Sequence, residues 1–450
     1  MSAVLSRANQ KTSQTVSATA KLRRVAVIGA GLAGLSTALR LGQQGYQVCV
    51  FEAAPQAGGR ARGVLHSSTT LDNGQHLCLG AYHATLALLR DAGLDHRHVF
   101  KRLALALHMH DGQHRISLVT PEWLPAPLHL LWGLITATGL DWQSKWRAIC
   151  WMRQLQKTAF TLAQDMPVSG LLAQAQQTPL AIKYLWEPLC LAALNTPLAL
   201  ASAQVFLNVL RDSFQHRRQD SDFLVARSDL STALIQPLLT QLQTRGVTVR
   251  LGTTVTAIEA FEHGCKLTHQ QQEVFDAVVL AVGPHQLKTI AGAPTLPWRE
   301  YQPITTIYLQ FSEQMRLPHP IMGLCGGWAQ WVFDRGQCCD QAGLLAVVIS
   351  AHAPFEMDKA VLVTHCLNEI NAALGNYDMA LQQTPLWTKI ITEKRATFSC
   401  SPALKRPGPQ TAHARIFLAG DYVASPYPAT IESAIRSGEA AAQAIARLLG

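Results

Sequence analysis

A glycine-rich segment between two strand-like runs constrains this chain more than any other feature. Residues 29–34 read Gly-Ala-Gly-Leu-Ala-Gly, follow an apolar, valine-rich run at 25–28 and lead into a helical pattern over 32–44. A second strand-like run at 48–51 completes a strand–helix–strand unit. The strands of such a unit are parallel, so we predict an α/β fold with a doubly wound sheet.

The spacing of these glycines predicts a phosphate-binding turn. Gly29 permits the tight turn, Gly31 lets the backbone approach a diphosphate, and Gly34 lets the helix pack closely on the sheet. The first helical turn has unpaired N–H groups and a positive partial charge, which suits an anion. We therefore predict a Rossmann-type domain that binds a dinucleotide at this loop, Ala33 included.

Two further groups after the second strand fit the same ligand. Glu52 ends the strand, where a carboxylate accepts hydrogen bonds from ribose hydroxyls and disfavours a 2′-phosphate; the alternative is a solvated strand end. Gly58-Gly59-Arg60 follows. Glycines admit close approach of the backbone and the arginine suits phosphate, although a surface turn has the same composition.

The segments at both ends of the chain resemble the amine oxidase and phytoene desaturase superfamily of flavoproteins. The acidic residue and glycine pair after the fingerprint match, and residues 417–421, Phe-Leu-Ala-Gly-Asp, are similar to the second FAD motif of that superfamily. The resemblance implies that Gly420 and Asp421 contact the ribityl or pyrophosphate region, and that a helix starting near Thr430 points at the isoalloxazine. The FAD-binding lobe is then discontinuous in sequence.

A narrower resemblance covers most of the chain. Three segments are similar to hydroxysqualene dehydroxylases, squalene-associated FAD-dependent desaturase-like enzymes of bacterial hopanoid synthesis: Leu-Asp-Asn-Gly-Gln-His at 71–76, Glu-Lys-Arg-Ala-Thr-Phe at 393–398, and the run at 428–438. This resemblance implies FAD contacts for Gly74, Gln75 and Val255. Tyr422-Val423 departs from the Trp-Thr of that family, which leaves FAD binding intact but changes the surroundings of the flavin.

Residues that monoamine oxidases need are missing. Cys400 does not lie in the Ser-Gly-Gly-Cys context through which those enzymes tether flavin, so we expect non-covalent FAD. The strand-like run at 303–308 lacks the lysine that they place against the flavin. Two alternatives stay open: a related desaturase or oxidase acting on a carotenoid, a porphyrinogen or an amine, and a non-catalytic FAD-binding protein.

The reaction implied by the narrower resemblance is reductive dehydroxylation of hydroxysqualene to squalene. An acid protonates the hydroxyl, water leaves, and reduced FAD supplies hydride. We assign no catalytic residue, because packing explains His76 and Tyr82 equally well. One complete fingerprint leaves no dedicated nicotinamide domain, so NADPH must dock transiently or a separate reductase must act. Upstream prenyl-condensing enzymes of squalene synthesis are the implied protein partners.

The chain of 450 residues is too long for one simple core, and its pattern changes along the sequence. Tryptophans, leucines and prolines dominate from about 105 to 220, which predicts a mostly helical insertion. The expected division is an N-terminal extension at 1–22, a discontinuous FAD-binding domain at 23–104, 221–290 and 396–450, and a substrate-binding domain at 105–220 and 291–395.

The balance of charge and cysteine limits partners and compartment. The formal charge of +9 favours anionic partners such as a diphosphate or an acidic membrane surface. No basic block exceeds two residues, so we expect no nucleic acid. The ten cysteines contain no C-x-x-C pair, which favours free thiols in a reducing cytoplasm and gives no metal site.

A nearly uncharged segment at 124–140 is too short and too proline-rich at its start for a convincing transmembrane helix. A buried core helix is one interpretation, and an interfacial segment that touches the inner face of the cell membrane is the other. An uncharged polyisoprenoid needs a long apolar tunnel, for which the helical insertion is the candidate, although an ordinary helical core has the same composition.

Overall fold

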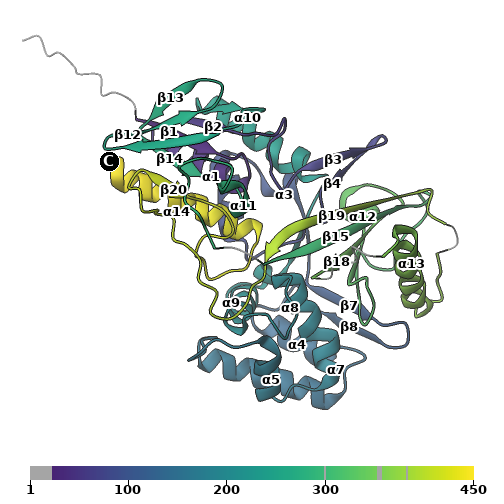
Figure 1. Cartoon of the computed structure of the whole chain (residues 1–450). Coiled ribbons are helices and arrows are strands. Elements are labelled where there is room, and N and C mark those ends of the chain that lie inside the picture. The colour runs from purple at the N-terminus through teal and green to yellow at the C-terminus, as the bar shows by residue number, and fades with distance from the viewer. Residues whose placement is uncertain (1–22, 298–299, 352–356, 382–383) are drawn as a thin grey trace, which may run out of the picture.

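The structure is a computed structural model that describes residues 23–297, 300–351, 357–381 and 384–450 (Figure 1). The extension that we predict over residues 1–22 lies outside these ranges. Two sheets form the framework, and a group of helices lies below them in the view of Figure 1.

The first sheet is parallel and confirms the predicted α/β fold. Its order, β10-β2-β1-β14-β20, joins segments from both ends of the chain. The strands are β10 (Thr248–Arg250), β2 (Gln47–Phe51), β1 (Arg24–Ile28), β14 (Ala277–Leu280) and β20 (Ile416–Leu418). Alternate residues of β1 are buried on opposite faces: Val25 and Val27 pack with the helices, whereas Ala26 and Ile28 belong to the other core. A strand covered on both faces is apolar throughout, so this apolar run could be recognised as a strand in the sequence.

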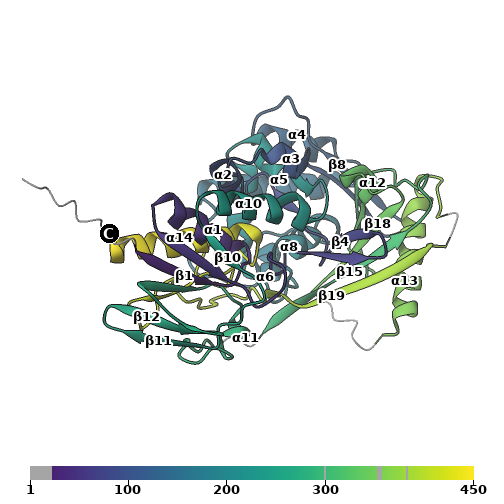
Figure 2. The same ribbon diagram turned by 90° about the horizontal axis from the view of Figure 1, so that it is seen from above.

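Helices α1 (Leu32–Gln43), α10 (Gln236–Thr244) and α14 (Ile431–Leu449) cover one face of this sheet, and the meander β11 (Ala257–Phe261), β12 (Gly264–Thr268) and β13 (Gln272–Phe275) covers the other (Figure 2). α1 and α14 touch through their backbones, because a methyl group on Gly438 would overlap the carbonyl oxygen of Ala33. Ser36 Oγ and Thr37 Oγ1 also donate to backbone carbonyls of α14 at 3.1 Å. The last helix is thus fixed on the first.

The second sheet has the order β19-β15-β18-β17-β16-β7-β8. The strands are β19 (Trp387–Phe398), β15 (Tyr301–Gln310), β18 (Leu344–Ser350), β17 (Trp331–Asp334), β16 (Ile321–Leu324), β7 (Ala106–His110) and β8 (Arg115–Val119). Helix α13 (Lys359–Gly375) packs on one face, where Val332 and Val347 are buried. The intervening residues Trp331, Phe333 and Val348 point to the opposite face, as the pleat of a strand requires.

The predicted insertion at 105–220 differs from expectation at its start. Residues 106–119 form the hairpin β7–β8, which extends the second sheet because β7 pairs in parallel with β16. The helices begin only afterwards: α4 (Leu128–Thr136), α5 (Trp142–Lys157), α6 (Val168–Gln174), α7 (Pro179–Ala181), α8 (Glu187–Leu194) and α9 (Ala203–Phe214). The hairpin was missed because its partner strand lies more than two hundred residues further along the chain.

Short elements connect these bodies. They are β3 (Gly63–His66), β4 (Thr69–Asp72), β5 (Cys78–Leu79), β6 (Phe100–Leu103), β9 (Phe223–Ala226), α2 (His83–Ala92), α3 (His96–Val99), α11 (Pro284–Leu287) and α12 (Arg335–Cys339). None of the helices in the described ranges is both long and apolar enough to cross a bilayer. The domain boundaries given above remain our proposal.

Candidate functional site

A cavity of about 910 Å³ lies where the carboxyl ends of the parallel strands meet the second sheet. The residues that follow β1, β2, β14 and β20 all line it: Gly29, Glu52, Ala281 and Gly420. This edge is where open α/β sheets bind their ligands, because the strand order diverges there and leaves a crevice. The position of the cavity therefore follows from the topology of the sheet.

The three fingerprint glycines meet different surroundings. Gly29 has φ +105°, and a Cβ there would lie 2.7 Å from the carbonyl oxygen of Ala281. A methyl group on Gly34 would overlap the Gly29 carbonyl oxygen, so Gly34 is required for packing. At Gly31 a Cβ would meet nothing within 4 Å, although this residue lines the cavity. The open space beside Gly31 is what a closely approaching diphosphate requires.

The carboxylate of Glu52 is fixed beside this turn. Its Oε2 accepts from the N–H of Ala30 at 2.8 Å, and its Oε1 accepts from the N–H of Ala54 at 2.9 Å. Each oxygen keeps a second lone pair for a hydroxyl. The loop carrying Gly58 and Gly59 folds onto the same turn, because Gly58 N–H donates to the Ala30 carbonyl at 2.9 Å. The loop thus adds a second backbone wall to the cavity.

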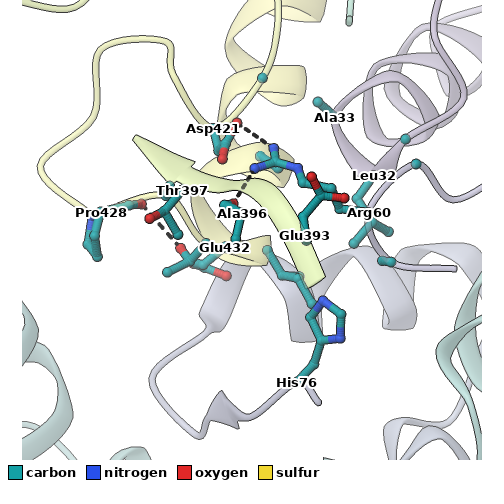
Figure 3. Close-up of a pocket in the computed structure, with 18 of the residues that line it drawn as sticks. Leu32, Ala33, Arg60, His76, Glu393, Ala396, Thr397, Asp421, Pro428 and Glu432 are labelled. Atoms are coloured by element: carbon teal, nitrogen blue, oxygen red, sulfur yellow. Dashed lines mark hydrogen bonds and ion pairs between the residues drawn. The ribbon is translucent and has the colours of Figure 1, made fainter. Parts of the chain in front are cut away.

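Arg60 turns toward the C-terminal motif (Figure 3). Its Nη2 lies 2.7 Å from Asp421 Oδ1, and its Nη1 donates to the carbonyl of Ala396 at 2.6 Å. The Asp421 carboxylate raises the pKa of the Arg60 guanidinium. Tyr301, which also lines the cavity here, has a buried hydroxyl without a hydrogen-bond partner in the described ranges. A buried hydroxyl of this kind fits a polar ligand that completes its hydrogen bonding.

The start of α14 forms the next part of the wall. Thr430 caps the helix by accepting from Ser433 N–H at 3.2 Å, and Ala429, Thr430 and Ile431 line the cavity. The positive end of a long helix therefore faces the site. Glu432 faces away from solvent and is only 3% exposed, because it accepts hydrogen bonds from α2. Its role in the structure is to join two helices.

A buried polar network supports the segment after β4. Tyr308 Oη donates to the Asp72 carbonyl at 3.0 Å, and the backbone N–H of Gln75 donates to Thr306 Oγ1 at 3.1 Å. Arg335, only 1% exposed, donates to Gln75 Oε1 at 2.7 Å and lies 3.4 Å from Asp72. The network holds residues 73–76, all of which line the cavity, in one conformation.

His76 and Tyr82 both line the cavity. Burial lowers the pKa of the His76 imidazole and raises that of the Tyr82 phenol. Both side chains are therefore uncharged at neutral pH. Neutral groups of this kind orient a substrate by hydrogen bonds and are weak as proton donors.

The rest of the cavity is mostly apolar and extends between the second sheet and the helices, although the polar residues Asn195, Asp212, Ser213 and Ser221 also line it. Its walls come from α8, α9, β9, β17 and β18 and the segment before β7: Leu105, Leu189, Ala193, Phe206, Val209, Leu210, Phe223, Trp331, Phe333 and Val348. The tryptophans of the helical insertion are absent from these walls. The insertion contributes leucine and phenylalanine instead, since Trp151 and Trp186 pack on each other in its core with ring centroids 4.8 Å apart.

Every residue predicted to contact the cofactor lines this cavity except Gly34, whose place is under the turn. The backbone space at Gly31, the fixed Glu52 carboxylate and the orphaned Tyr301 hydroxyl fit FAD. Sequence reasoning missed Arg335 and Tyr301, together with Trp331 and Phe333, because no motif marks them. Among the described residues, no group of three or more His, Cys, Asp or Glu side chains is arranged to hold a metal ion.

Comparison with known proteins accounts for this arrangement. The model of the family described as flavin-containing amine oxidoreductase matches residues 32–446. The chain belongs to that family. It is an FAD-dependent oxidoreductase, and the motif resemblance to hydroxysqualene dehydroxylases is confirmed across the chain.

The relatives of this oxidoreductase include hydroxysqualene dehydroxylases and a carotene desaturase. Hydroxysqualene dehydroxylase of Rhodopseudomonas palustris is 30% identical over 94% of this chain and 98% of its own length, and that of Sinorhizobium fredii is 29% identical over 93% and 97%. A probable zeta-carotene desaturase of Synechococcus elongatus is 23% identical over 94% and 98%. Among solved structures, putrescine oxidase bound to putrescine has a TM-score of 0.69 at 16% identity, over 95% of this chain and 99% of its own. That likeness concerns the fold alone.

Proposed function

We propose that this oxidoreductase removes the hydroxyl group of hydroxysqualene reductively and releases squalene and water. One observation carries the proposal: the cavity joins the loops expected to bind FAD to a mostly apolar chamber, and the Asp212 carboxylate, which also lines it, is paired with Arg211. A linear polyisoprenoid offers almost nothing but apolar surface, so such a chamber suits it. The likeness to hydroxysqualene dehydroxylases over nearly the whole chain supports this substrate.

In the proposed reaction the C–O bond breaks, the oxygen leaves as water after taking a proton, and the carbon gains hydride. Bound FAD supplies that hydride when reduced. The chain itself positions the reactants: the network of Arg335, Gln75 and Asp72 fixes the polar wall, and Phe206 and Phe333 exclude water from the developing cation. All ten cysteines are free thiols, which supports our proposal that the protein acts in the reducing cytoplasm.

The test is product identity under anaerobic conditions. Purified protein with chemically reduced FAD and hydroxysqualene should yield squalene, and in D₂O the product should gain one deuterium, because the N5 hydrogen of reduced flavin exchanges with solvent. The Gly31→Ala variant serves as a control with weakened FAD binding. Unchanged hydroxysqualene, together with new double bonds in a carotenoid precursor supplied with oxidised FAD and an added electron acceptor, would replace the proposal by desaturation, which the zeta-carotene desaturase relative favours.

The source of electrons is a separate part of the proposal. We propose NADPH or a reductase as donor, and an upstream prenyl-condensing enzyme as the supplier of hydroxysqualene. Anaerobic bleaching of the flavin on adding NADPH alone would assign direct reduction. Bleaching that requires an added flavin reductase would assign the second route.

A further inference from the structure

Large apolar side chains are exposed together on the helical insertion. Trp123, Trp132, Trp142 and Trp146 are 73%, 48%, 62% and 52% exposed. Leu128 and Ile135, which lie between these tryptophans in the sequence, are 49% and 41% exposed. We call these six residues the tryptophan face. Exposed aromatic groups that gather in this way mark an interaction surface, since single exposed apolar residues are otherwise scattered.

On α5 the exposed side chains combine tryptophan with positive charge. Trp142, Trp146, Cys150, Arg153 and Lys157 recur at helical spacing and are all exposed. They form one stripe along the outer side of the helix. Lysine and arginine occur four times in α5, and aspartate and glutamate do not occur in it. An outward stripe of this composition is typical of helices that lie in a membrane interface.

Helix α4 continues the same face. Leu128, Trp132 and Ile135 project from one side of it, and the ring centroids of Trp123 and Trp132 lie 6.1 Å apart. Lys145 of α5 donates to the Ile135 carbonyl at 2.8 Å, which joins the two helices. Helices α4 and α5 contact each other and lie at the end of the helical insertion away from the parallel sheet (Figure 1).

We propose that the tryptophan face docks on an anionic lipid bilayer. Tryptophan prefers the boundary between acyl chains and headgroups, and the bases of α5 complement negative lipid headgroups. Charge complementarity favours an anionic lipid surface over a second copy of this chain. In a dimer through this face, the basic residues of one copy would repel those of the other. No spanning helix is needed, and none is found in the described ranges.

The docking surface adjoins the cavity. His129, on the buried side of α4, lies 3.0 Å from Ser221 Oγ through its Nε2, and Ser221 lines the cavity. Thr120, just before the tryptophan face, donates to the carbonyl of Leu105, another lining residue. If the proposed function holds, this arrangement brings the apolar chamber next to the lipid phase that dissolves a polyisoprenoid. Docking itself does not depend on that function.

The test uses the chain as it exists. Cys150 is the single exposed thiol in the described ranges and lies in the α5 stripe, so a polarity-sensitive fluorophore can be attached there. We expect a blue shift and co-sedimentation with vesicles rich in phosphatidylglycerol. Binding to pure phosphatidylcholine vesicles should be weaker, by about fivefold for each base engaged, and should fall with added salt. Neither readout requires substrate or turnover.

Variants separate the two contributions. Trp142→Ser/Trp146→Ser should lower vesicle affinity by about tenfold or more, because both side chains lose their apolar burial in lipid. Arg153→Glu/Lys157→Glu should lower affinity for anionic vesicles only, by more than about tenfold. Leu65→Ser/Leu386→Ser is the matched control: these leucines are 72% and 70% exposed outside the helical insertion, so the change should leave vesicle affinity unaltered. Flavin absorbance reports retained folding in each variant.

Two results would overturn the proposal. One is equal vesicle binding by the wild type, by Trp142→Ser/Trp146→Ser and by Arg153→Glu/Lys157→Glu, with no blue shift at Cys150. The other is a stable dimer in sedimentation velocity that the Trp142→Ser/Trp146→Ser change dissociates, without vesicle binding by the wild type. The face would then be an interface between copies.

Discussion

Gly31 and Gly34 stand three residues apart in one loop, yet the structure requires each of them for a different reason. Gly34 lies against the Gly29 carbonyl oxygen, so any side chain there disturbs the packing of α1 on the sheet. Gly31 has free space on its cavity side. A ligand requirement and a folding requirement can therefore be separated with one methyl group each.

We predict that Gly31→Ala leaves the unfolding free energy of the apoprotein within about 0.5 kcal/mol of wild type, because its methyl group meets no atom. The same change should weaken FAD binding by about tenfold or more, since it occupies the approach of the diphosphate. Gly34→Ala should instead cost about 1–3 kcal/mol through overpacking. Urea titration measures stability, and flavin fluorescence measures FAD affinity. An FAD affinity of Gly31→Ala equal to that of the wild type would refute diphosphate binding at Gly31.

Two histidines of β7 illustrate burial of titratable groups away from the cavity. His108 and His110 are 8% and 0% exposed. The His108 ring stacks on His319 with centroids 3.4 Å apart, and Tyr377 Oη lies 3.2 Å from His110 Nε2. Burial lowers the pKa of each to about 4, and the neighbouring Arg115 contributes in the same direction.

This burial predicts a loss of stability on acidification. The unfolded chain takes up these protons near pH 6.5 and the folded chain only near pH 4, so stability is full above pH 6.5 and falls as the pH drops toward 4. The loss should be on the order of 3 kcal/mol for each histidine. Urea unfolding across this window measures it. His108→Gln/His110→Gln should flatten the slope and the exposed His413→Gln should not; an unchanged slope in the double variant contradicts the assignment.

At the scale of elements, α14 holds the site together. Its N-terminus faces the cavity, its middle lies on α1 through Gly438, and Glu432 ties it to α2. The Glu432 carboxylate accepts from Ala84 N–H at 2.9 Å, from Thr85 N–H at 2.9 Å and from Arg436 Nε at 2.8 Å. A single buried carboxylate thus sets where the helix start lies.

We predict that Glu432→Gln destabilises the fold by about 2–4 kcal/mol, because an amide nitrogen cannot accept these charge-assisted hydrogen bonds. FAD affinity should fall as well, since the start of α14 loses its fixed position. Glu439→Gln on the same helix is the control: its partner Arg40 is partly exposed, so the cost should be about 0–1 kcal/mol. Thermal unfolding with and without FAD compares the two variants, and equal shifts would contradict a special role for Glu432.

At the scale of the whole molecule, the cavity is built from residues that the sequence keeps far apart. Arg60 and Asp421 meet across the site although one belongs to the first motif and the other to the last. FAD bound between these motifs, as we propose, would stabilise only the folded chain. Binding and global stability are therefore linked.

We predict that FAD at a hundredfold excess over its dissociation constant raises the unfolding free energy by about 2.7 kcal/mol. Hydrogen exchange should slow in β1 and in β20 together, because both strands end at the cavity. Asp421→Asn and Gly31→Ala change opposite ends of the chain, and each should reduce the stabilisation that FAD provides. Slower exchange confined to β1 would contradict a shared site.

Parts of the fold that obey local rules can be predicted from the amino-acid sequence alone. The strand, turn and helix at 25–44 follow from periodicity and glycine geometry within a short window, and the motif resemblance gave the start of the last helix near Thr430. Local rules identified Gly29, Gly31, Glu52, Gly59 and Arg60, whereas the family resemblance supplied Gly74, Gln75, Gly420 and Asp421; all nine line the cavity. The glycine motif can be recognised for a physical reason: a backbone that binds a diphosphate closely needs glycine at fixed positions.

Other features depend on contacts between segments that are distant in the sequence. The hairpin β7–β8 joined the second sheet through a partner edge that no local window encodes. Arg335 became part of the site because α12 packs beneath Gln75, and tryptophans that composition assigned to a core emerged on the surface of α4 and α5. Burial and long-range pairing depend on which elements pack together, and that choice is made by the whole chain.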